Sequence, residues 1–135
     1  MSDRTFHHTV RVPYADTDAM GVVYYANYLV YFEMARSELL REAGIPYGRL
    51  EAEGLFLPVI EAHCEYRRPA RYEDLLEIRT RCTELRRARL RMDYEIFRGD
   101  ERIAAGYTWH ACVSPQGRAR RPGAMLADLF KGEDT

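Results

Sequence analysis

The feature that most constrains the fold is one long helical pattern placed between stretches with strand-like patterns. From Tyr25 to Ala43 apolar residues recur every three or four positions and most charged residues fall between them, which predicts an amphipathic helix. Asn27 is a candidate N-cap for this helix. Gly44 suits the left-handed position that follows a helix, and Pro46 prevents its continuation. We expect this to be the longest helix of the chain.

Stretches of alternating apolar and polar residues surround this helix and are typical of half-buried strands. A β-branched run predicts one strand before it, and four alternating stretches predict strands after it: residues 6–12, 60–67, 76–82, 89–96 and 103–113. The Gly99-Asp100 pair predicts a hairpin turn between the last two strands, and residues 122–130 predict a short helix. One long helix beside five antiparallel strands indicates an α+β architecture, with the helix packed on one face of the sheet.

Length and charge limit what else the chain can be. Its 135 residues suit a single domain over residues 1–135. A net charge of -1 disfavours nonspecific binding to nucleic acid. No apolar run approaches the roughly 18 residues that a membrane span needs. The first thirty residues show no secretory signal, so we expect a cytoplasmic protein without membrane insertion.

The cysteines and histidines give no sign of a metal site or a cofactor. Cys64, Cys82 and Cys112 are odd in number and far apart, which favours reduced, buried thiols over a disulfide framework. The four histidines have none of the spacings typical of zinc ligands. We therefore expect no bound metal and no cofactor.

The segment just before the long helix carries the residues best suited to chemistry. It places Asp16, Asp18 and Gly21 where unpaired backbone N–H groups and the positive end of the helix dipole converge. Such amides can hold a developing oxyanion, and a nearby carboxylate can attack the carbon or activate water. The simpler interpretation, a capping or turn aspartate, stays open on this pattern alone. A calcium loop does not fit, since Met20 and Asn27 stand at ligand positions.

The longer string over residues 14–28, with Phe32-Glu33 and Ala35-Arg36, resembles the signature of the hotdog-fold acyl-CoA thioesterases. It is similar to the 4-hydroxybenzoyl-CoA thioesterases and to the thioesterases associated with the Tol-Pal system. The resemblance implies a hotdog fold, in which a five-stranded antiparallel sheet wraps around one long central helix. It also implies hydrolysis of acyl-CoA or aryl-CoA thioesters to free acid and CoA, by a homotetramer built from hotdog dimers.

The resemblance assigns roles to particular residues. Asp18 corresponds to the catalytic carboxylate, acting as nucleophile or general base, and Asp16 to a residue that hydrogen bonds within the loop. Gly21 belongs to the substrate-binding loop. A backbone N–H in the region of Tyr24 and Tyr25 corresponds to the group that polarises the thioester carbonyl. The tyrosine-rich string over residues 24–28 is closer to the hydroxybenzoyl type, which indicates either an aryl-CoA substrate or aromatic packing at a dimer interface.

Arginines cluster at the expected turn between the strands at 76–82 and 89–96. Guanidinium groups bind phosphate oxygens in pairs, and the resemblance assigns Arg86 and Arg87 to the phosphates of CoA. The alternative is a solvated strand face, and the two interpretations are evenly balanced. A second arginine group, at positions 118, 120 and 121, is expected to be ordinary surface.

Two further residues and two further functions complete the candidates. Glu33 is best explained by an ion pair with Arg36, although some hotdog branches use a helix carboxylate from the partner subunit. His63 is expected to be an exposed histidine. A dehydratase of the same fold needs a catalytic histidine motif that this chain lacks. The remaining alternative is a non-catalytic acyl-CoA-binding or protein-interaction module.

Overall fold

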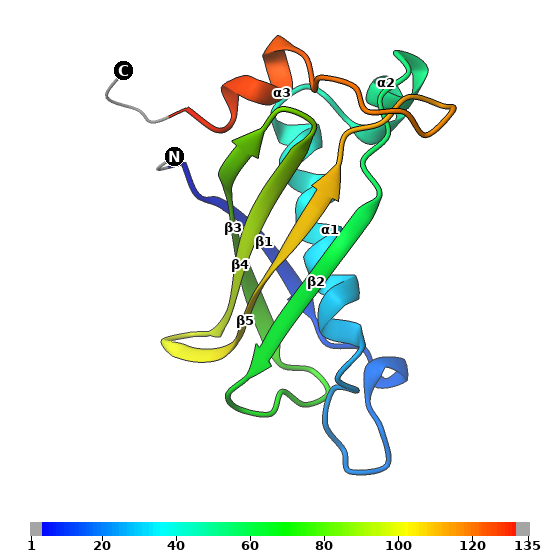
Figure 1. Cartoon of the computed structure of the whole chain (residues 1–135). Coiled ribbons are helices and arrows are strands. Elements are labelled where there is room, and N and C mark those ends of the chain that lie inside the picture. The colour runs from blue at the N-terminus through cyan, green and yellow to red at the C-terminus, as the bar shows by residue number, and fades with distance from the viewer. Residues whose placement is uncertain (1–3, 132–135) are drawn as a thin grey trace.

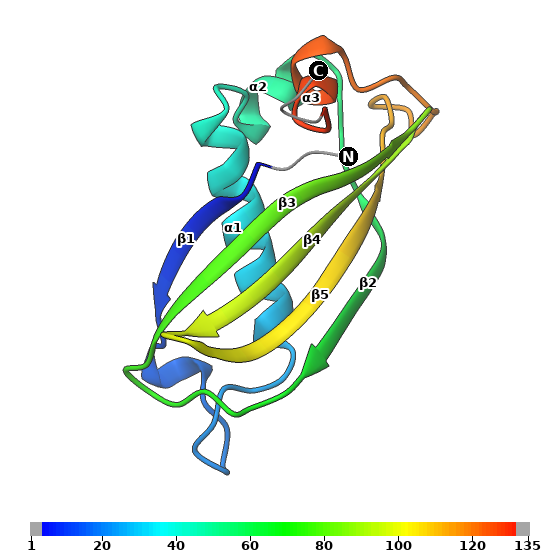
Figure 2. The ribbon, with the colours of Figure 1, turned by 90° about the vertical axis from the view of Figure 1, so that its left-hand side faces the viewer.

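A curved antiparallel sheet wraps around one long helix, which confirms the predicted hotdog arrangement (Figures 1 and 2). The computed structural model describes residues 4–131. All neighbouring strands are antiparallel, in the order β1-β3-β4-β5-β2. The strands are β1 (Phe6–Arg11), β2 (Val59–Tyr66), β3 (Leu75–Arg86), β4 (Arg89–Arg98) and β5 (Glu101–Ala111). The helices are α1 (Asn27–Glu42), α2 (Tyr47–Ala52) and α3 (Ala124–Asp128), with a 3-10 turn, η1 (Tyr14–Asp16).

The C-terminal end of α1 lies where the sequence predicts it, but the N-terminal end does not. Gly44 ends the helix as expected, in the left-handed conformation at φ +83°. The helix begins at Asn27 rather than at Tyr25, and Ala26 occupies the cap position, so the expected N-cap role of Asn27 is wrong. The side-chain amide of Asn27 instead donates to the backbone carbonyl of Asp16, 3.0 Å away. This bond ties the preceding loop to the first turn of the helix.

The remaining elements follow the predicted pattern, with one addition and one difference in burial. The expected half-buried character of residues 60–67 is wrong, because every residue of β2 except Cys64 is exposed. Each predicted strand is present, and β4 and β5 form the expected hairpin around Gly99. The short helix at 122–130 is confirmed in a shorter form, because it begins only after Pro122. Helix α2 is not predicted by the periodicity, since it has six residues and buries only Leu50. Among residues 4–131 even the longest helix lacks the length and apolar character of a membrane span.

The core lies between α1 and the concave face of the sheet. Phe32 of α1 stacks on Tyr94 of β4 with ring centroids 4.3 Å apart and planes within 7°. Cys82 and Cys112 are free and fully buried, and burial raises the pKa of the Cys82 thiol to about 12 and that of Cys112 to about 11. These two cysteines therefore act as apolar filling in the core, as expected from the sequence.

A chain of hydrogen bonds runs through this core. The buried guanidinium of Arg36 donates to the hydroxyl of Tyr94 (3.0 Å), which lies 2.7 Å from Oγ1 of Thr108. This hydroxyl lies 2.8 Å from Nε2 of His110, whose Nδ1 lies 3.0 Å from the carbonyl oxygen of Leu57. Since arginine only donates and a carbonyl only accepts, every bond is satisfied when His110 is neutral with its proton on Nδ1.

This chain makes the stability of the protein depend on pH. Burial, together with the charge of Arg36, lowers the pKa of His110 from 6.5 to about 4. Between these values the unfolded chain binds a proton that the folded chain excludes, so the free energy of unfolding falls as the pH falls. The difference between the two pKa values corresponds to about 3 kcal/mol, present above pH 6.5 and lost by pH 4.

Urea unfolding of the wild type and of His110→Gln at pH 7 and at pH 4.5 measures this contribution. Glutamine leaves polar partners unsatisfied and destabilises the protein at pH 7, but it cannot be protonated. We therefore expect the stability difference between the two proteins to shrink as the pH falls. Equal pH dependence in both proteins would contradict the assigned protonation state of His110.

Candidate active site

The loop between β1 and α1 carries Asp18 and Gly21 and projects beyond the end of the sheet (Figure 1). An antiparallel bridge between Thr17 and Val23 closes the loop at its base. Inside it, the Asp18 N–H donates to the carbonyl of Val22, and the Gly21 N–H donates to the carbonyl of Asp18, both at 2.9 Å. Gly21 has φ +79°, a conformation that side chains with a Cβ disfavour. Asp18 therefore lies in a turn whose backbone is held by these hydrogen bonds.

The carboxylate of Asp18 is half-buried and has one oxygen engaged. Its Oδ1 accepts the backbone N–H of Met20, 2.9 Å away, in a local turn of the kind that aspartate favours. Among residues 4–131, Oδ2 has neither a hydrogen-bond donor nor a cation within ion-pair distance. One carboxylate oxygen is thus held in place while the other is available to a ligand or to water.

Asp16 has the opposite arrangement, because both its side chain and its backbone are occupied. Its Oδ2 accepts the hydroxyl of the buried Tyr31 at 2.7 Å. Burial and this bond raise the pKa of Tyr31, which keeps the hydroxyl a donor. The backbone carbonyl of Asp16 accepts the N–H of Tyr24 at 2.9 Å. These contacts are the loop hydrogen bonding expected for Asp16.

The backbone amides at the start of α1 are not equivalent. The N–H of Tyr24 is used by Asp16, and the N–H groups of Asn27 and Tyr28 donate to the carbonyls of Tyr24 and Tyr25. Within the part of the chain that the structure describes, the N–H groups of Tyr25 and Ala26 have no backbone acceptor. The free amides thus lie at Tyr25 and the residue after it, in the positive field of the helix start.

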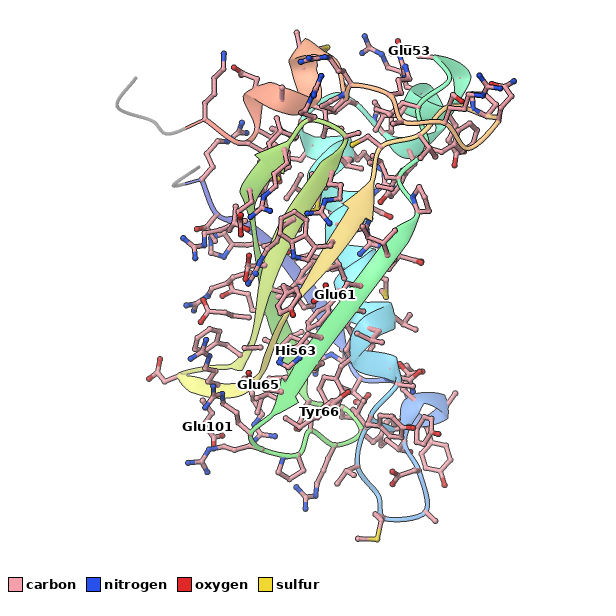
Figure 3. The ribbon with its side chains drawn as sticks, in the orientation of Figure 1. Glu53, Glu61, His63, Glu65, Tyr66 and Glu101 are labelled. Atoms are coloured by element: carbon pink, nitrogen blue, oxygen red, sulfur yellow. The ribbon has the colours of Figure 1, made fainter. Side chains whose placement is uncertain are left out.

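Four tyrosines form one wall beside these amides, and one of them comes from a distant part of the sequence. Ring centroids lie 4.8 Å apart for Tyr24 and Tyr25, 6.3 Å for Tyr25 and Tyr66, and 5.2 Å for Tyr28 and Tyr66. The hydroxyl of Tyr66 donates to the carbonyl of Tyr25 at 3.1 Å. Figure 3 shows Tyr66 at the end of β2, beside the start of α1. Sequence reasoning missed Tyr66, because only strand β2 brings it to the loop.

Arg86 and Arg87 lie at the β3–β4 turn, at the opposite end of the sheet from the Asp18 loop (Figures 1 and 2). Strand β3 has 12 residues, and at about 3.3 Å per residue it spans about 36 Å. Arg86 donates to Glu84 at 3.0 Å and lies 5.2 Å above the ring of Trp109. One chain therefore does not bring these arginines to its own Asp18.

The two secondary candidates lie away from this loop. The expected ion pair between Glu33 and Arg36 is wrong, because Arg36 turns into the core while Glu33 stays exposed. His63 is exposed, as predicted, and lies on the outer face of the sheet. Its Nε2 is 3.1 Å from Glu65, and its ring stacks on Tyr107 with centroids 5.1 Å apart (Figure 3). Neither residue takes part in the Asp18 site of its own chain.

Known proteins share this fold and sequence. A 1,4-dihydroxy-2-naphthoyl-CoA hydrolase from Synechococcus elongatus is 34% identical over 90% of this chain and 90% of its own. The acyl-CoA thioester hydrolase YbgC from Escherichia coli is 44% identical over 64% of each chain. The crystal structure of a DHNA-CoA thioesterase from Staphylococcus aureus has a TM-score of 0.82 and 28% identity, over 87% of this chain and 80% of its own.

A family-level comparison agrees with these relatives. The pattern of the Thioesterase superfamily matches residues 20–105, a range that begins within the Asp18 loop and covers α1 and strands β2 to β4. The matched range is more than half of the chain, and it contains the free amide of Tyr25 and the wall formed with Tyr66. The chain belongs to the Thioesterase superfamily of hotdog-fold enzymes.

Proposed function

We propose that the protein hydrolyses acyl-CoA or aryl-CoA thioesters to the free acid and CoA, with Asp18 as the catalytic carboxylate. The observation that carries this proposal is the free Oδ2 of Asp18 in a fixed turn just before a helix start that has free amides. The names of the relatives, acyl-CoA thioester hydrolase and 1,4-dihydroxy-2-naphthoyl-CoA hydrolase, support the substrate class. No metal or cofactor enters the proposed reaction.

The reaction follows from these groups. The thioester carbonyl oxygen accepts the N–H of Tyr25, and the helix start stabilises the negative charge that develops on this oxygen. The Asp18 carboxylate either attacks the carbonyl carbon or removes a proton from an attacking water. The carbon–sulfur bond breaks, and the CoA thiolate leaves and takes up a proton. In the first case water then hydrolyses the acyl-aspartyl anhydride and restores the carboxylate.

The aromatic wall favours a planar acyl group. Tyr24, Tyr25 and Tyr66 are 46%, 60% and 48% exposed, so their rings are available to stack on a ligand. Hydrogen bonding to Tyr25 raises the pKa of Tyr24, which keeps that hydroxyl protonated beside Asp18. We therefore infer that aryl-CoA thioesters are better substrates than short aliphatic ones. Free thiols at all three cysteines suit a reducing compartment, and we place the enzyme in the cytoplasm.

A thiol-release assay with a panel of CoA thioesters tests this function. The panel runs from acetyl-CoA through benzoyl-CoA and hydroxybenzoyl-CoA to palmitoyl-CoA. We expect turnover, with the highest kcat/KM for an aryl substrate. Saturable binding of these thioesters without thiol release would instead identify a non-catalytic acyl-CoA-binding module.

The assembly we propose is a homotetramer built from dimers, in which a second copy covers β2. This strand ends the sheet and leaves one row of backbone groups unpaired. Exposed apolar side chains on α1 and β2 accompany this edge: Leu29, Val30, Met34, Val59 and Ile60. An unpaired edge beside such side chains suits pairing with a second copy of the strand. A neighbouring copy also offers Arg86 and Arg87 to a substrate held at Asp18, which a single chain cannot do.

Mixing two inactive variants tests whether subunits share a site. One variant carries Asp18→Asn and the other carries Arg86→Gln with Arg87→Gln. If Asp18 and the arginines come from different subunits, a mixed dimer contains one intact site and has about half of the wild-type activity. Random co-expression makes about half of the dimers mixed, so the whole preparation recovers about a quarter of the wild-type activity. The assay uses acyl-CoA well below KM, so that loss of phosphate binding is visible. Mixed dimers with no more activity than either parent would show that each chain supplies its whole site.

A further inference from the structure

The hydroxyl of Tyr66 reaches a backbone group beside the free amides of the candidate site. It donates to the carbonyl oxygen of Tyr25 at 3.1 Å, across 41 positions of sequence. Tyr66 is the last residue of β2, and Figure 3 shows it beside the start of α1. The same carbonyl accepts the N–H of Tyr28 at 3.3 Å, a bond of the first helical turn. Two donors from different elements therefore hold this one carbonyl.

The carbonyl that Tyr66 holds belongs to the same peptide group as the N–H of Ala26. A trans peptide group is planar, so its C=O and N–H point in opposite directions and turn together. Fixing the carbonyl of Tyr25 therefore fixes the direction of the Ala26 N–H. Within residues 4–131 this N–H has no backbone acceptor, like the N–H of Tyr25. The hydroxyl of Tyr66 thus holds the two free amides in one orientation relative to each other.

The same hydrogen bond makes the Ala26 N–H a better donor. Hydrogen bonds that share a polar group polarise one another and strengthen each bond by about 10–30%. A hydroxyl on the carbonyl oxygen draws electron density from the peptide nitrogen, so the N–H hydrogen becomes more positive. An oxyanion is stabilised best by donors that are already aimed at it before the charge develops. The Tyr25–Ala26 peptide meets this condition because Tyr66 holds it from the sheet.

The surroundings of Tyr66 keep its hydroxyl protonated and its ring in place. Burial and the neighbouring Cys64 raise the pKa of Tyr66 to about 12, so the hydroxyl remains a donor at neutral pH. The ring meets those of Tyr25 and Tyr28 edge to face, with centroids 6.3 and 5.2 Å apart. These ring contacts do not need the hydroxyl. The two parts of the side chain can therefore be tested separately.

We propose that Tyr66 is a positioning residue, whose hydroxyl fixes the Tyr25–Ala26 peptide so that the N–H of Ala26 becomes a second donor to the thioester carbonyl oxygen. This inference rests on the proposed function, which assigns the first donor to Tyr25. The ring of Tyr66 contributes to binding of the acyl group. Its hydroxyl acts through the peptide on a charge that develops only in the transition state, so it affects kcat and not KM.

The variant Tyr66→Phe, which removes only the hydroxyl, tests this role. We expect kcat to fall by about three- to ten-fold with KM unchanged, as for the loss of one neutral hydrogen bond. The factor should be the same for acetyl-CoA and benzoyl-CoA, because both have the carbonyl that is polarised. Tyr66→Leu also removes the ring, and it should in addition raise KM for benzoyl-CoA. In NMR spectra without substrate, the ¹⁵N resonance of Ala26 should shift in Tyr66→Phe, because the preceding carbonyl loses a donor.

Tyr107→Phe is the matched control. The hydroxyl of Tyr107 donates to Glu61 at 2.6 Å and so also links β2 to a neighbouring element, but on the outer face of the sheet. This variant should keep the wild-type kcat and the wild-type Ala26 resonance. A wild-type kcat in Tyr66→Phe, or an equal fall in both variants, would overturn the proposal. If wild type hydrolyses no thioester, the proposed hydrolysis is wrong, and the Ala26 resonance still decides whether Tyr66 fixes this peptide.

Discussion

Asp18→Asn is expected to lower kcat/KM for acyl-CoA by about 10³-fold or more, as for the loss of a residue that forms or activates the nucleophile. Asparagine keeps the size of the side chain and an oxygen that accepts the Met20 N–H, so the loop turn persists. It removes the charge that either attacks the carbonyl carbon or takes a proton from water. The binding of CoA should change little, because the residues proposed for its phosphates, Arg86 and Arg87, are not altered.

Asp16→Asn is the matched control for this experiment, since it makes the same chemical change two residues away. Asp16 bonds the hydroxyl of Tyr31 and has no free oxygen in the role proposed for Asp18. We expect it to lower the melting temperature more than Asp18→Asn and to lower kcat/KM much less. Circular dichroism and size exclusion establish that both variants fold and assemble. Wild-type turnover in a folded Asp18→Asn protein would exclude Asp18 as the catalytic group.

The secondary structure of α1, β3 and β4 was predictable because one face of each of these elements is buried. In α1 the buried residues recur with helical spacing, and in β3 and β4 burial alternates residue by residue. Helix α2 was not predictable in this way, since its six residues make less than two turns and bury one side chain. The first residue of α1 was not predictable from the burial pattern either. The side chain of Asn27 donates to the backbone carbonyl of Asp16 there, and the spacing of apolar residues does not predict this hydrogen bond.

The site was predictable only where it is local in sequence. Asp16, Asp18 and the amide of Tyr25 lie within one short segment, so their types and spacing could indicate chemistry before the fold was known. Tyr66 reaches Tyr25 through β2 and donates to its backbone carbonyl. Such contacts depend on strand order and register, which no short pattern specifies.

The burial of Arg36 is a third feature that the sequence does not predict. On the helix surface, residues three apart are neighbours, so an ion pair with Glu33 was the simplest expectation. The guanidinium instead reaches the hydroxyls of Tyr47 and Tyr94 beneath α1. A charge can be buried in this way only when polar partners from other elements converge on it. Those partners come from α2 and β4, and the sequence around Arg36 does not reveal them.

Gly106→Ala is expected to destabilise the protein by about 3 kcal/mol or more, as for severe overpacking of a core. Gly106 of β5 pairs with Cys64 of β2, beneath the ring of Phe32. A Cβ at this position would overlap the carbonyl oxygen of His63 and lie 2.9 Å from Cε2 of Phe32. The carbonyl oxygen of His63 belongs to the backbone, so β2 itself would have to move away from β5.

The position of Gly106 also links packing to activity. A displaced β2 carries Tyr66 away from Tyr25, so we expect folded Gly106→Ala protein to lose kcat/KM as well as stability. Gly48→Ala is the matched control. Gly48 lies in α2, where an added Cβ would meet no atom within 4 Å, and the exchange should be neutral or stabilise by up to about 1 kcal/mol. Thermal unfolding and thiol release on both variants measure the two effects. Equal stability of the two variants would show that β2 and β5 yield to a methyl group without cost.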